Sequence, residues 1–425
     1  AWGHTVNQPD LVDTFELELN PQNENQYKID GEWLELERRL APLEIRLWRD
    51  FRWTVNREVL YSIFGPAMRV NGRVFAVRYA GIGEFRQTEQ WYRMGRAESL
   101  EQFKDAMRIQ ALAMFNTGYG DRDGNIFYAY NALLPERADG HDWSGTVPGN
   151  TRDTLWTEYR PFDQLPIVEN PKSGFIQNCN SDPFRTSIGG DNPDESAFSE
   201  NYGIEKWMTN RARRAVELYG SDESITHDEF FLYKYDKLYS EKSNLRRQVA
   251  DFVEVQEGNS ELKKEIDILR QWNGETTKDN RSAALVLLTF RPRSNSSKLK
   301  TGHERTLEQL QRASGNLVKH FGQIDVEWGK VNRLVRGDKN LPLGGGPDTL
   351  RAIYGRPQED GTLAGQAGDC FFQFVEWDKD GQLNAWAMNQ FGSSPGNPGS
   401  LHHTDQAPLF AEEKLRKVPF TREEV

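Results

Sequence analysis

The fold of this chain is constrained most strongly by the order in which strand-like and helix-like spacings of apolar residues follow each other along the sequence. Over the first hundred residues, apolar and polar side chains alternate as in half-buried strands, for example at residues 15–19 and 44–48. Residues 74–79 form a denser apolar run, which is typical of a strand buried on both faces. Asp30-Gly31 and Asn71-Gly72 mark hairpin turns. The first part of the chain is therefore predicted to be a meander of antiparallel strands.

After these strands, the apolar residues take on the spacing of a helix. Ser99 is suited to cap a helix over residues 99–115, in which apolar side chains recur every three to five positions. Helical patterning also dominates residues 201–325, where Thr226 and Glu229 have the spacing of a capping box. A turn at residues 121–125 leads into another predicted strand at residues 126–130, and the strand period returns again near the C-terminal end. Most of the helices are therefore predicted to lie between two strand-rich regions.

Two segments are predicted to be loops. Residues 135–200 are rich in Pro and Gly, and residues 291–300 are polar and rich in Ser. Long irregular stretches in a compact protein are usually functional or form interfaces.

Strands at both ends with helices between them, in no βαβ rhythm, predict an α+β fold. We interpret residues 1–425 as a single domain with three regions. Residues 1–200 are strand-rich with loops, residues 201–325 are mostly helical, and residues 340–425 supply the C-terminal strands.

Composition excludes several classes of protein. The chain has 53 basic and 64 acidic side chains, a net charge of −11, which argues against nucleic acid as a main partner. No run approaches the roughly 18 apolar residues of a membrane-spanning helix. Cys179 and Cys370 allow at most one disulfide and exclude a Cys-rich zinc site.

Three stretches carry most of the functional information. They read WGHTVNQPDLVDTF at residues 2–15, NPKSGFIQNCN at residues 170–180, and QFGSSPGNP at residues 390–398 with HTDQ at residues 403–406. In this order and spacing they resemble the large (β) subunit of the penicillin acylase family, particularly its acyl-homoserine-lactone acylase branch. The resemblance covers essentially the whole chain.

The resemblance implies an N-terminal-nucleophile hydrolase with an αββα sandwich, a helical insertion and C-terminal strands. Such enzymes are exported, to the periplasm or outside the cell, and cut themselves into two subunits. The exposed N-terminal Ser of the β subunit then attacks an amide carbonyl, with its own α-amine as base. An α-amine has a pKa of about 8, close to the operating pH, which suits a general base. No cofactor is required for this chemistry.

The first residue, Ala1, has no nucleophilic atom. By the family pattern the chain lacks the Ser nucleophile, the start of the β subunit and the small α subunit, and those segments are its expected partners. The expected substrate is a small acyl amide, most readily an N-acyl-homoserine lactone, whose cleavage would quench quorum sensing. Penicillin or another N-acyl amide is the alternative substrate. A noncatalytic binding relic of the fold is the alternative function.

The resemblance also assigns candidate catalytic residues. Val6 matches the position whose backbone N–H supplies one donor of the oxyanion hole, and Asn180 matches the Asn whose side-chain amide supplies the other. Arg211 matches an Arg that orients this Asn. From the residues alone, the favoured interpretation of Asn180 is a turn residue in a polar loop. Arg211 could be an exposed helix residue like its neighbours Arg213 and Arg214, which we interpret as surface charges.

A structural calcium site is implied at Asp10, Val12 and Asp13, where two carboxylates and a backbone carbonyl offer oxygen ligands. Oxygen ligands suit Ca²⁺, but about six are needed and the rest would come from elsewhere. The alternative is a polar turn that leads into a strand.

The same family pattern predicts self-association of this chain. Without the first strands of the β subunit and the α subunit, sheet edges and pocket walls would be uncovered. We expect dimers or larger species that bury the strands around residues 2–15 or 74–79.

Residues 1–425 by themselves are predicted to hydrolyse no amide, because the attacking oxygen and its base are missing from the sequence. Purified chain should be assayed with a long-chain acyl-homoserine lactone and with a chromogenic acyl anilide. Turnover that survives repurification would contradict this mechanism.

Overall fold

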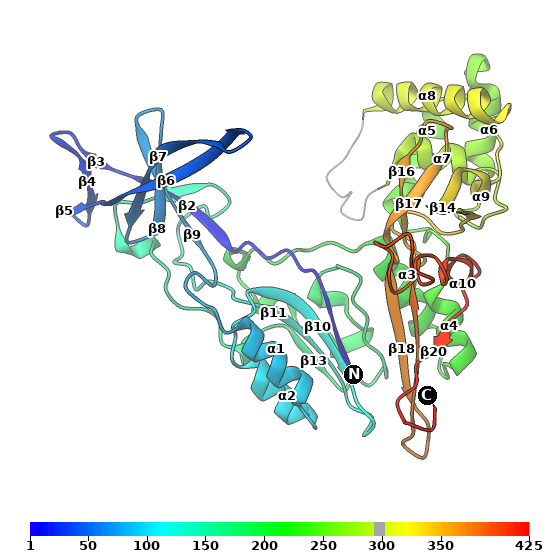
Figure 1. Cartoon of the computed structure of the whole chain (residues 1–425), viewed down its shortest axis with the longest axis horizontal. Helices are drawn as coiled ribbons and strands as arrows, with labels where there is room; N and C mark the ends of the chain where they lie inside the picture. Colours follow the sequence, from blue (N-terminus) through cyan, green and yellow to red (C-terminus); the bar gives the residue numbers. More distant parts are fainter. Residues whose placement is uncertain (293–301, 425) are drawn as a thin grey trace.

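The computed structural model describes residues 1–292 and 302–424, so most of the predicted loop at 291–300 lies outside the described residues. Most helices lie between a strand-rich N-terminal part and a strand-rich C-terminal part of the chain, and the predicted α+β class is confirmed. Strands β2–β9 form one end of the molecule in Figure 1, and a group of helices with strands β14–β17 forms the other. None of the described helices is long and apolar enough to cross a membrane.

The first strands form the predicted antiparallel meander, and a short parallel strand is added at one edge. The sheet has the order β12-β2-β9-β8-β7-β6, and a small sheet β3-β4-β5 lies beside it. The predicted turns Asp30-Gly31 and Asn71-Gly72 connect β4 to β5 and β8 to β9. The bounds are β2 Val12–Leu17, β3 Leu19–Asn20, β4 Asn23–Ile29, β5 Glu32–Glu35, β6 Glu37–Trp48, β7 Phe51–Ser62, β8 Gly65–Val70, β9 Arg73–Tyr79 and β12 Thr146–Pro148.

The six-stranded sheet packs a core on one face only. Val74 and Ala76 of β9 are buried in a cluster with Phe15 and Phe64, whose rings stack 4.4 Å apart. Tyr79, on the opposite face of β9, is exposed. The prediction that residues 74–79 are buried on both faces is therefore wrong for this chain. β9 also lies between β2 and β8, so it has no free edge of the kind we expected to pair with another molecule.

A second sheet, with the order β1-β10-β11-β13, carries the N-terminal strand at its edge. Asp121 forms the turn between β10 and β11, where its Oδ1 accepts the N–H groups of Asp123 and Asn125 and Gly124 has a φ of +86°. Helices α1 and α2 pack with this sheet, and Phe103 of α2 is fully buried against it. The bounds are β1 Trp2–Thr5, β10 Met114–Gly120, β11 Ile126–Ala132, β13 Ile167–Glu169, α1 Gln87–Arg96 and α2 Leu100–Met107.

The predicted helix over residues 99–115 is too long. Ser99 caps α2 as expected, but the helix ends at Met107. Buried Gln90 of α1 accepts the N–H groups of Ala111 and Leu112 at 2.7 and 3.0 Å. This tertiary contact draws the chain out of the helix and into β10, against the local periodicity.

The middle of the chain is helical, and the predicted capping box of Thr226 and Glu229 is confirmed at the start of α4. Helices α5 to α9 bury a common core around Leu285 and Trp328. The bounds are α3 Asn210–Gly220, α4 His227–Lys234, α5 Asn244–Val255, α6 Lys263–Gln271, α7 Ala283–Phe290, α8 His303–Phe321 and α9 Trp328–Val331. The loop region before α3 contains single turns of 3₁₀ helix, at Arg152–Thr154, Phe162–Gln164, Pro183–Arg185, Gly189–Asp191, Glu195–Ala197 and Glu200–Tyr202, and one more lies at Ser260–Leu262.

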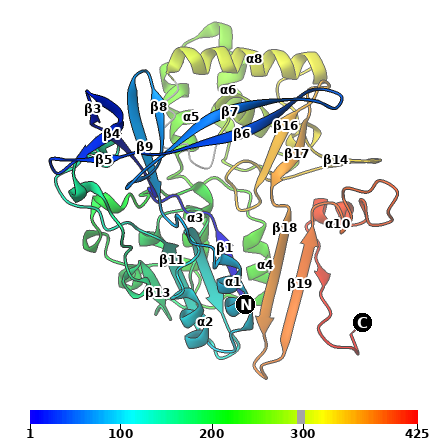
Figure 2. The same cartoon turned by 60° about the vertical axis from the view of Figure 1, so that its left-hand side comes forward.

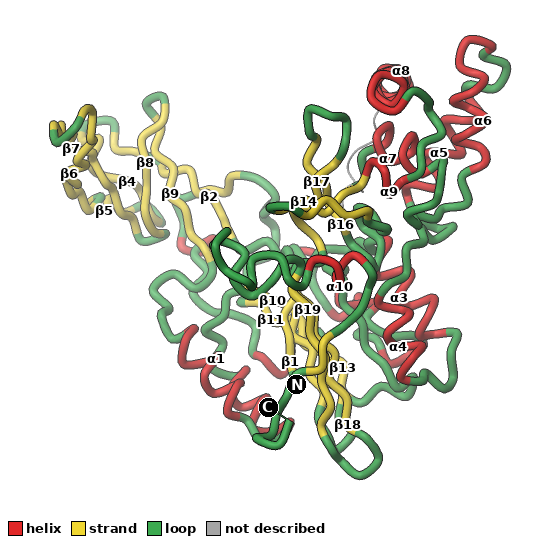
Figure 3. Tube along the Cα trace, turned by 45° about the vertical axis from the view of Figure 1, so that its right-hand side comes forward, coloured by secondary structure: helices red, strands yellow, loops and turns green. Residues whose placement is uncertain are grey.

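The C-terminal strands form two further sheets, β15-β14-β17-β16 and β18-β19-β20. The N-terminal strand β1 lies close to β18 and β19 in all three views (Figures 1, 2 and 3). The bounds are β14 Asn332–Arg336, β15 Lys339–Pro342, β16 Ile353–Pro357, β17 Leu363–Gly368, β18 Phe371–Trp377, β19 Leu383–Asn389, α10 Ala407–Ala411 and β20 Arg416–Lys417.

Candidate active site

Val6 lies where β1 leaves the sheet, and its neighbours on both sides are fixed. Thr5 pairs with Asn116 of β10, and its hydroxyl donates to Oδ1 of Asn178. Asn7 is fully buried and donates from Nδ2 to the carbonyl of Asn131 at 3.0 Å. Among the described residues the Val6 N–H donates to no acceptor, and the residue is partly exposed. The backbone N–H of Val6 is thus a positioned and available donor.

Asn180 lies beside Val6, although the two are 174 positions apart in the sequence. Its Nδ2 donates to the Val6 carbonyl at 2.9 Å, and its own backbone N–H donates to Oδ1 of Asn178 at 3.0 Å. Its φ of +60° is left-handed, a conformation that Asn tolerates better than most residues. Asn180 is therefore a turn residue, as the interpretation from the residues alone predicted. Its side chain is also held in a fixed position by a hydrogen bond.

Arg211 fixes the orientation of the Asn180 amide. Its Nη2 donates to Oδ1 of Asn180 at 2.9 Å. A guanidinium is only a donor, so the Asn180 atom that faces it must be the oxygen, and the NH₂ group must face Val6. Because an amide NH₂ has two donors, one remains for a ligand after the bond to Val6 is made. The structure thus brings Val6, Asn180 and Arg211 together.

Arg211 is not the exposed helix residue of the alternative interpretation. It is the second residue of α3 and its side chain is mostly buried. The helix start is tied to the Asn180 loop by Thr209, the N-cap residue, whose hydroxyl donates to the Cys179 carbonyl at 3.0 Å. Arg214 is also mostly buried and pairs with Asp236 at 2.9 Å, so its assignment as a surface charge was wrong.

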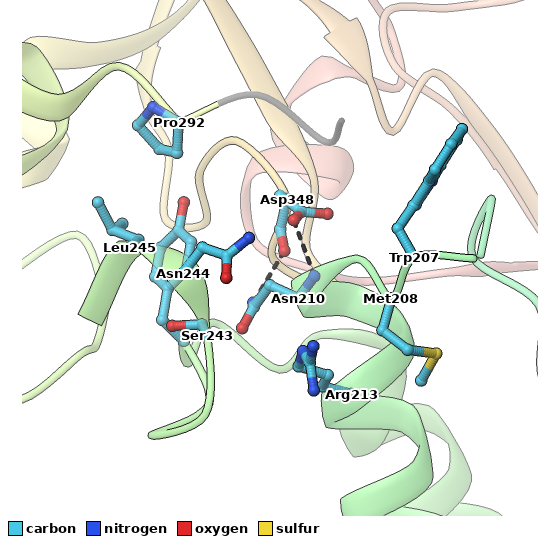
Figure 4. Close-up of a pocket in the computed structure, with 10 residues that line it drawn as sticks. Trp207, Met208, Asn210, Arg213, Ser243, Asn244, Leu245, Pro292 and Asp348 are labelled. Atoms are coloured by element: carbon cyan, nitrogen blue, oxygen red, sulfur yellow. Dashed lines mark hydrogen bonds between the residues drawn. The ribbon is translucent and has the colours of Figure 1, made fainter. Parts of the chain in front are cut away.

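Asp348 supports this arrangement from behind and was not singled out in the sequence. One carboxylate oxygen accepts from Nε of Arg211 at 3.3 Å, and the other accepts the backbone N–H of Asn210 at 2.8 Å. Figure 4 shows Asp348 against the start of α3, bonded to Asn210. Its φ of +63° is left-handed, so the backbone is held in a conformation that few L-residues adopt. No sequence pattern marks this residue, because the contact spans 137 positions.

The neighbouring polar network was also missed. Asn178 Oδ1 accepts from Asn116 Nδ2 at 3.1 Å, and the Tyr128 hydroxyl donates to Oδ1 of Asn116 at 2.6 Å. Tyr128 is fully buried, and burial raises its pKa well above the usual value, so it stays a neutral donor. The network fixes the Asn178 turn that carries Asn180.

An open pocket of about 610 Å³ lies on the same loop. Asn178 and Cys179 form part of its wall, and Phe175, Tyr219 and Phe230 give it an aromatic lining. Burial raises the pKa of the Cys179 thiol, which disfavours the reactive thiolate. The pocket can take an apolar group, and nothing about Cys179 indicates a nucleophile.

The predicted calcium residues surround a guanidinium. Nε of Arg137 donates to Oδ2 of Asp13 at 2.9 Å, and its Nη2 donates to the Asp10 carbonyl at 2.9 Å. Trp156 Nε1 also donates to Oδ2 of Asp13, at 2.7 Å. Burial raises the pKa of Asp13, and the Arg137 charge opposes this shift. Arg137, which sequence reasoning missed, is the partner of these carboxylates.

The fit of a calcium ion here is incomplete. Oδ1 of Asp13 is buried without a hydrogen-bond partner, as an oxygen ligand would be. However, the positively charged guanidinium of Arg137 already pairs with the Asp13 carboxylate. Val12, the third predicted ligand, is exposed beside this ion pair. The described residues contain no group of three or more His, Cys, Asp or Glu side chains that could hold a metal ion. Calcium at this place stays a prediction, and no step of the chemistry below depends on it.

Comparison with known proteins identifies the fold. The chain superposes on a thermostable penicillin G acylase from Alcaligenes faecalis with a TM-score of 0.67 and 16% identity, covering 100% of this chain and 86% of that one. This likeness confirms the N-terminal-nucleophile hydrolase fold predicted from the sequence. A family model described as penicillin amidase matches residues 1–425, and the chain therefore belongs to the penicillin amidase family.

Curated relatives agree with this assignment. The chain is 22% identical over 490 residues to an acyl-homoserine lactone acylase PvdQ of Pseudomonas fluorescens, covering 100% of this chain and 61% of the relative. It is 29% identical over 183 residues to a penicillin G acylase of Escherichia coli, covering 43% of this chain and 21% of the relative. The chain thus spans about three fifths of the length of the PvdQ relatives.

The Asp13–Arg137 pair gives a stability prediction. Both side chains have no solvent exposure, and removing one partner leaves an uncompensated buried charge, so Arg137→Met should lower the unfolding free energy by about 3–5 kcal/mol. Arg52, which pairs with Glu44 on the surface, offers the control: Arg52→Met should cost about 1 kcal/mol or less. Urea unfolding of both variants measures the difference, and equal losses would contradict the role of the buried pair.

Asp348 gives a pH prediction. Burial raises its pKa from 3.8 to about 6, against the opposing charge of Arg211. The native state then binds the proton more tightly than the unfolded state, so the stabilisation is present below about pH 4 and is lost as the pH rises through about 6. The shift of about two units corresponds to about 3 kcal/mol.

Replacing the titrating group isolates this effect. The unfolding free energy of wild type minus that of Asp348→Asn should fall by up to about 3 kcal/mol between about pH 4 and pH 7.5. Urea titrations of both proteins across this range measure it. A constant difference would mean that Asp348 does not change its pKa on folding.

Proposed function

We propose that this chain is the substrate-activating part of an acylase that hydrolyses the amide bond of N-acyl-homoserine lactones. The observation that carries the proposal is the junction of Val6, Asn180 and Arg211. An available backbone N–H lies next to a side-chain amide whose donor side is set by a guanidinium. Two donors so arranged suit the oxyanion that forms when an amide carbonyl is attacked.

The proposed reaction follows from the family. The N-terminal Ser of the mature β subunit attacks the amide carbonyl and its α-amine takes the hydroxyl proton. The α-ammonium then gives this proton to the leaving nitrogen, and the amine product departs from the tetrahedral intermediate. Water then releases the fatty acid from the acyl-enzyme. The residues of this chain would bind the carbonyl oxygen as it gains charge: the Val6 N–H and Asn180 Nδ2 donate to it, and Arg211 adds positive potential. Each such donor is typically worth about 3 kcal/mol in the transition state.

Arg211 and Asp348 would act by positioning. Above about pH 6 the Asp348 carboxylate is charged and serves as counter-ion to Arg211. The guanidinium then keeps the Asn180 oxygen, so the NH₂ group stays toward Val6 when the substrate arrives. This removes the cost of reorienting the donor during the reaction.

The substrate class is proposed from the PvdQ relatives, whose names state acyl-homoserine lactone acylase. Action on these lactones would quench quorum sensing, in the periplasm or outside the cell, as part of a self-processed heterodimer. The second candidate is hydrolysis of penicillin or another acyl amide, which the names of the Escherichia coli and Alcaligenes faecalis relatives favour. A noncatalytic binding relic is the third, and the intact donor arrangement argues against it.

Asn180→Ala tests the proposal. In a complete, processed acylase that contains this chain, the variant should lower kcat by about 10²–10³ with little change in KM, because the lost donor acts on the oxyanion. Folding should change by about 1 kcal/mol or less, as for a partly exposed loop residue. Kinetics with a long-chain acyl-homoserine lactone and with penicillin G measure the effect and separate the two substrate classes.

The control is Arg213→Ala, a neighbouring helix residue with no bond to Asn180. Its kcat should be unchanged. Self-cleavage passes through a similar oxyanion, so the exposed N-terminal Ser must be verified by mass spectrometry before the kinetics are compared. Processed Asn180→Ala enzyme with wild-type kcat would reduce Asn180 to a turn residue.

A further inference from the structure

Segments that are far apart in the sequence meet at the guanidinium of Arg137. Its Nε donates to Oδ2 of Asp13 at 2.9 Å, its Nη2 donates to the Asp10 carbonyl at 2.9 Å, and its Nη1 donates to the Asn201 carbonyl at 2.5 Å. A carboxylate oxygen of Asp10 lies 3.7 Å from Nη2. The side chains of Arg137 and Asp13 have no solvent exposure. The guanidinium is therefore enclosed by oxygen atoms that come from two distant segments.

The backbone holds these segments close together. The N–H of Asp10 donates to the Gly203 carbonyl at 3.1 Å. Gly203 has a left-handed φ of +58°, and a Cβ atom at this position would collide with the Cβ of Asp10. Pro135, two residues before Arg137, forms a β-bridge with Tyr159. The fold itself thus places both the oxygen atoms and the guanidinium.

A calcium ion at this place would use the same oxygen atoms. Ca²⁺ takes about six to eight oxygen ligands at about 2.3–2.6 Å. The carboxylates of Asp10 and Asp13, two of the predicted ligands, both face Arg137. An ion bound to both would lie beside a buried positive charge, where like charges repel strongly because little water screens them. The guanidinium and the ion therefore exclude each other.

We propose that the Arg137 guanidinium takes the place of a calcium ion in this protein, and that removing it leaves a calcium site. The guanidinium is then the permanent cation that ties residues 10–13 to the loop ending at Gly203. The inference does not depend on the proposed function. It has a consequence for that function, since Val6 lies four residues before Asp10 and its N–H would be positioned without an exchangeable metal.

The oxygen atoms that remain without the guanidinium suit calcium. Asp13 would offer both carboxylate oxygens, because Oδ1 is buried without a hydrogen-bond partner and Oδ2 would lose its bond to Arg137. Asp10 would offer its carbonyl and Oδ1, and Asn201 would offer its carbonyl. Water in the space of the deleted side chain can complete the coordination shell. The two carboxylates would balance the charge of Ca²⁺.

The experiment compares thermal unfolding in excess calcium chloride and in EDTA. Wild type is measured as the 425-residue chain and within a complete acylase that contains it, and each should unfold at the same temperature in both solutions. The Arg137→Ala chain should unfold at a lower temperature than wild type in EDTA. Calcium should raise its midpoint by about 3 °C or more, because the ion binds the folded state only. Magnesium should raise it less, since Mg²⁺ demands a tighter octahedral shell.

Terbium(III), which resembles calcium in its oxygen ligands, reports whether the site is occupied. Trp156 donates from Nε1 to Oδ2 of Asp13 at 2.7 Å, so it lies close enough to excite an ion bound there. Arg137→Ala should show tryptophan-sensitised terbium emission that calcium displaces. The matched control is Arg137→Lys, which loses the planar fork but keeps the positive charge. Neither Arg137→Lys nor wild type should show this emission.

Several results would overturn the proposal. One is a midpoint of wild type that calcium raises, in the chain or in the complete acylase. Another is a folded Arg137→Ala chain that responds to neither calcium nor terbium. If Arg137→Ala folds only in calcium, the proposal is supported. If it folds in neither solution, the wild-type midpoints decide, and equal values in calcium and EDTA support the guanidinium as the resident cation. None of these measurements depends on amide hydrolysis, so a failure of the proposed function leaves them intact.

Discussion

The bridge that Arg211 forms between Asn180 and Asp348 holds the candidate site together. Asn180 lies 31 positions before Arg211 in the sequence, and Asp348 lies 137 positions after it. The loop that carries Asn180, the first turn of α3 and a turn before β16 therefore meet at one planar group. A guanidinium suits this task because its donors are rigidly spaced and it keeps its charge. The site depends on one ion pair that is buried well enough for its geometry to be unique.

Burial makes this bridge costly as well as specific. Asp348 loses hydration, which raises its pKa to about 6, and it recovers stability only through Arg211 and the N–H groups at the start of α3. The Asp13–Arg137 pair follows the same principle at the entrance to β2. Both pairs join segments that are distant in the sequence, and both fix the backbone near Val6 or Asn180. In this protein the buried charges specify position more than they add stability.

The sequence predicted those parts of the structure that local chemistry decides. Hairpin turns at Asp30-Gly31 and Asn71-Gly72, and the Thr226 capping box, form as expected because a few adjacent residues determine them. The helix over residues 99–115 was overestimated because Gln90, which ends it, comes from another helix. Val6, Asn180 and Arg211 could be proposed only through a family resemblance. Asp348 and Arg137 could not be proposed at all, since their roles exist only in the folded chain.

A short segment of chain joins the six-stranded sheet to the candidate site. The apolar run at residues 74–79 has the composition of a strand that is buried on both faces, yet in this chain only one of its faces is fully buried. Strand β2 of the same sheet begins six residues after Val6, and Asp10 between them donates its N–H to the Gly203 carbonyl at 3.1 Å. Asn7, in the same segment, donates to the Asn131 carbonyl at 3.0 Å. These two bonds to distant parts of the chain fix the path between the sheet and the Val6 N–H, so the position of this candidate donor depends on how β2 is packed.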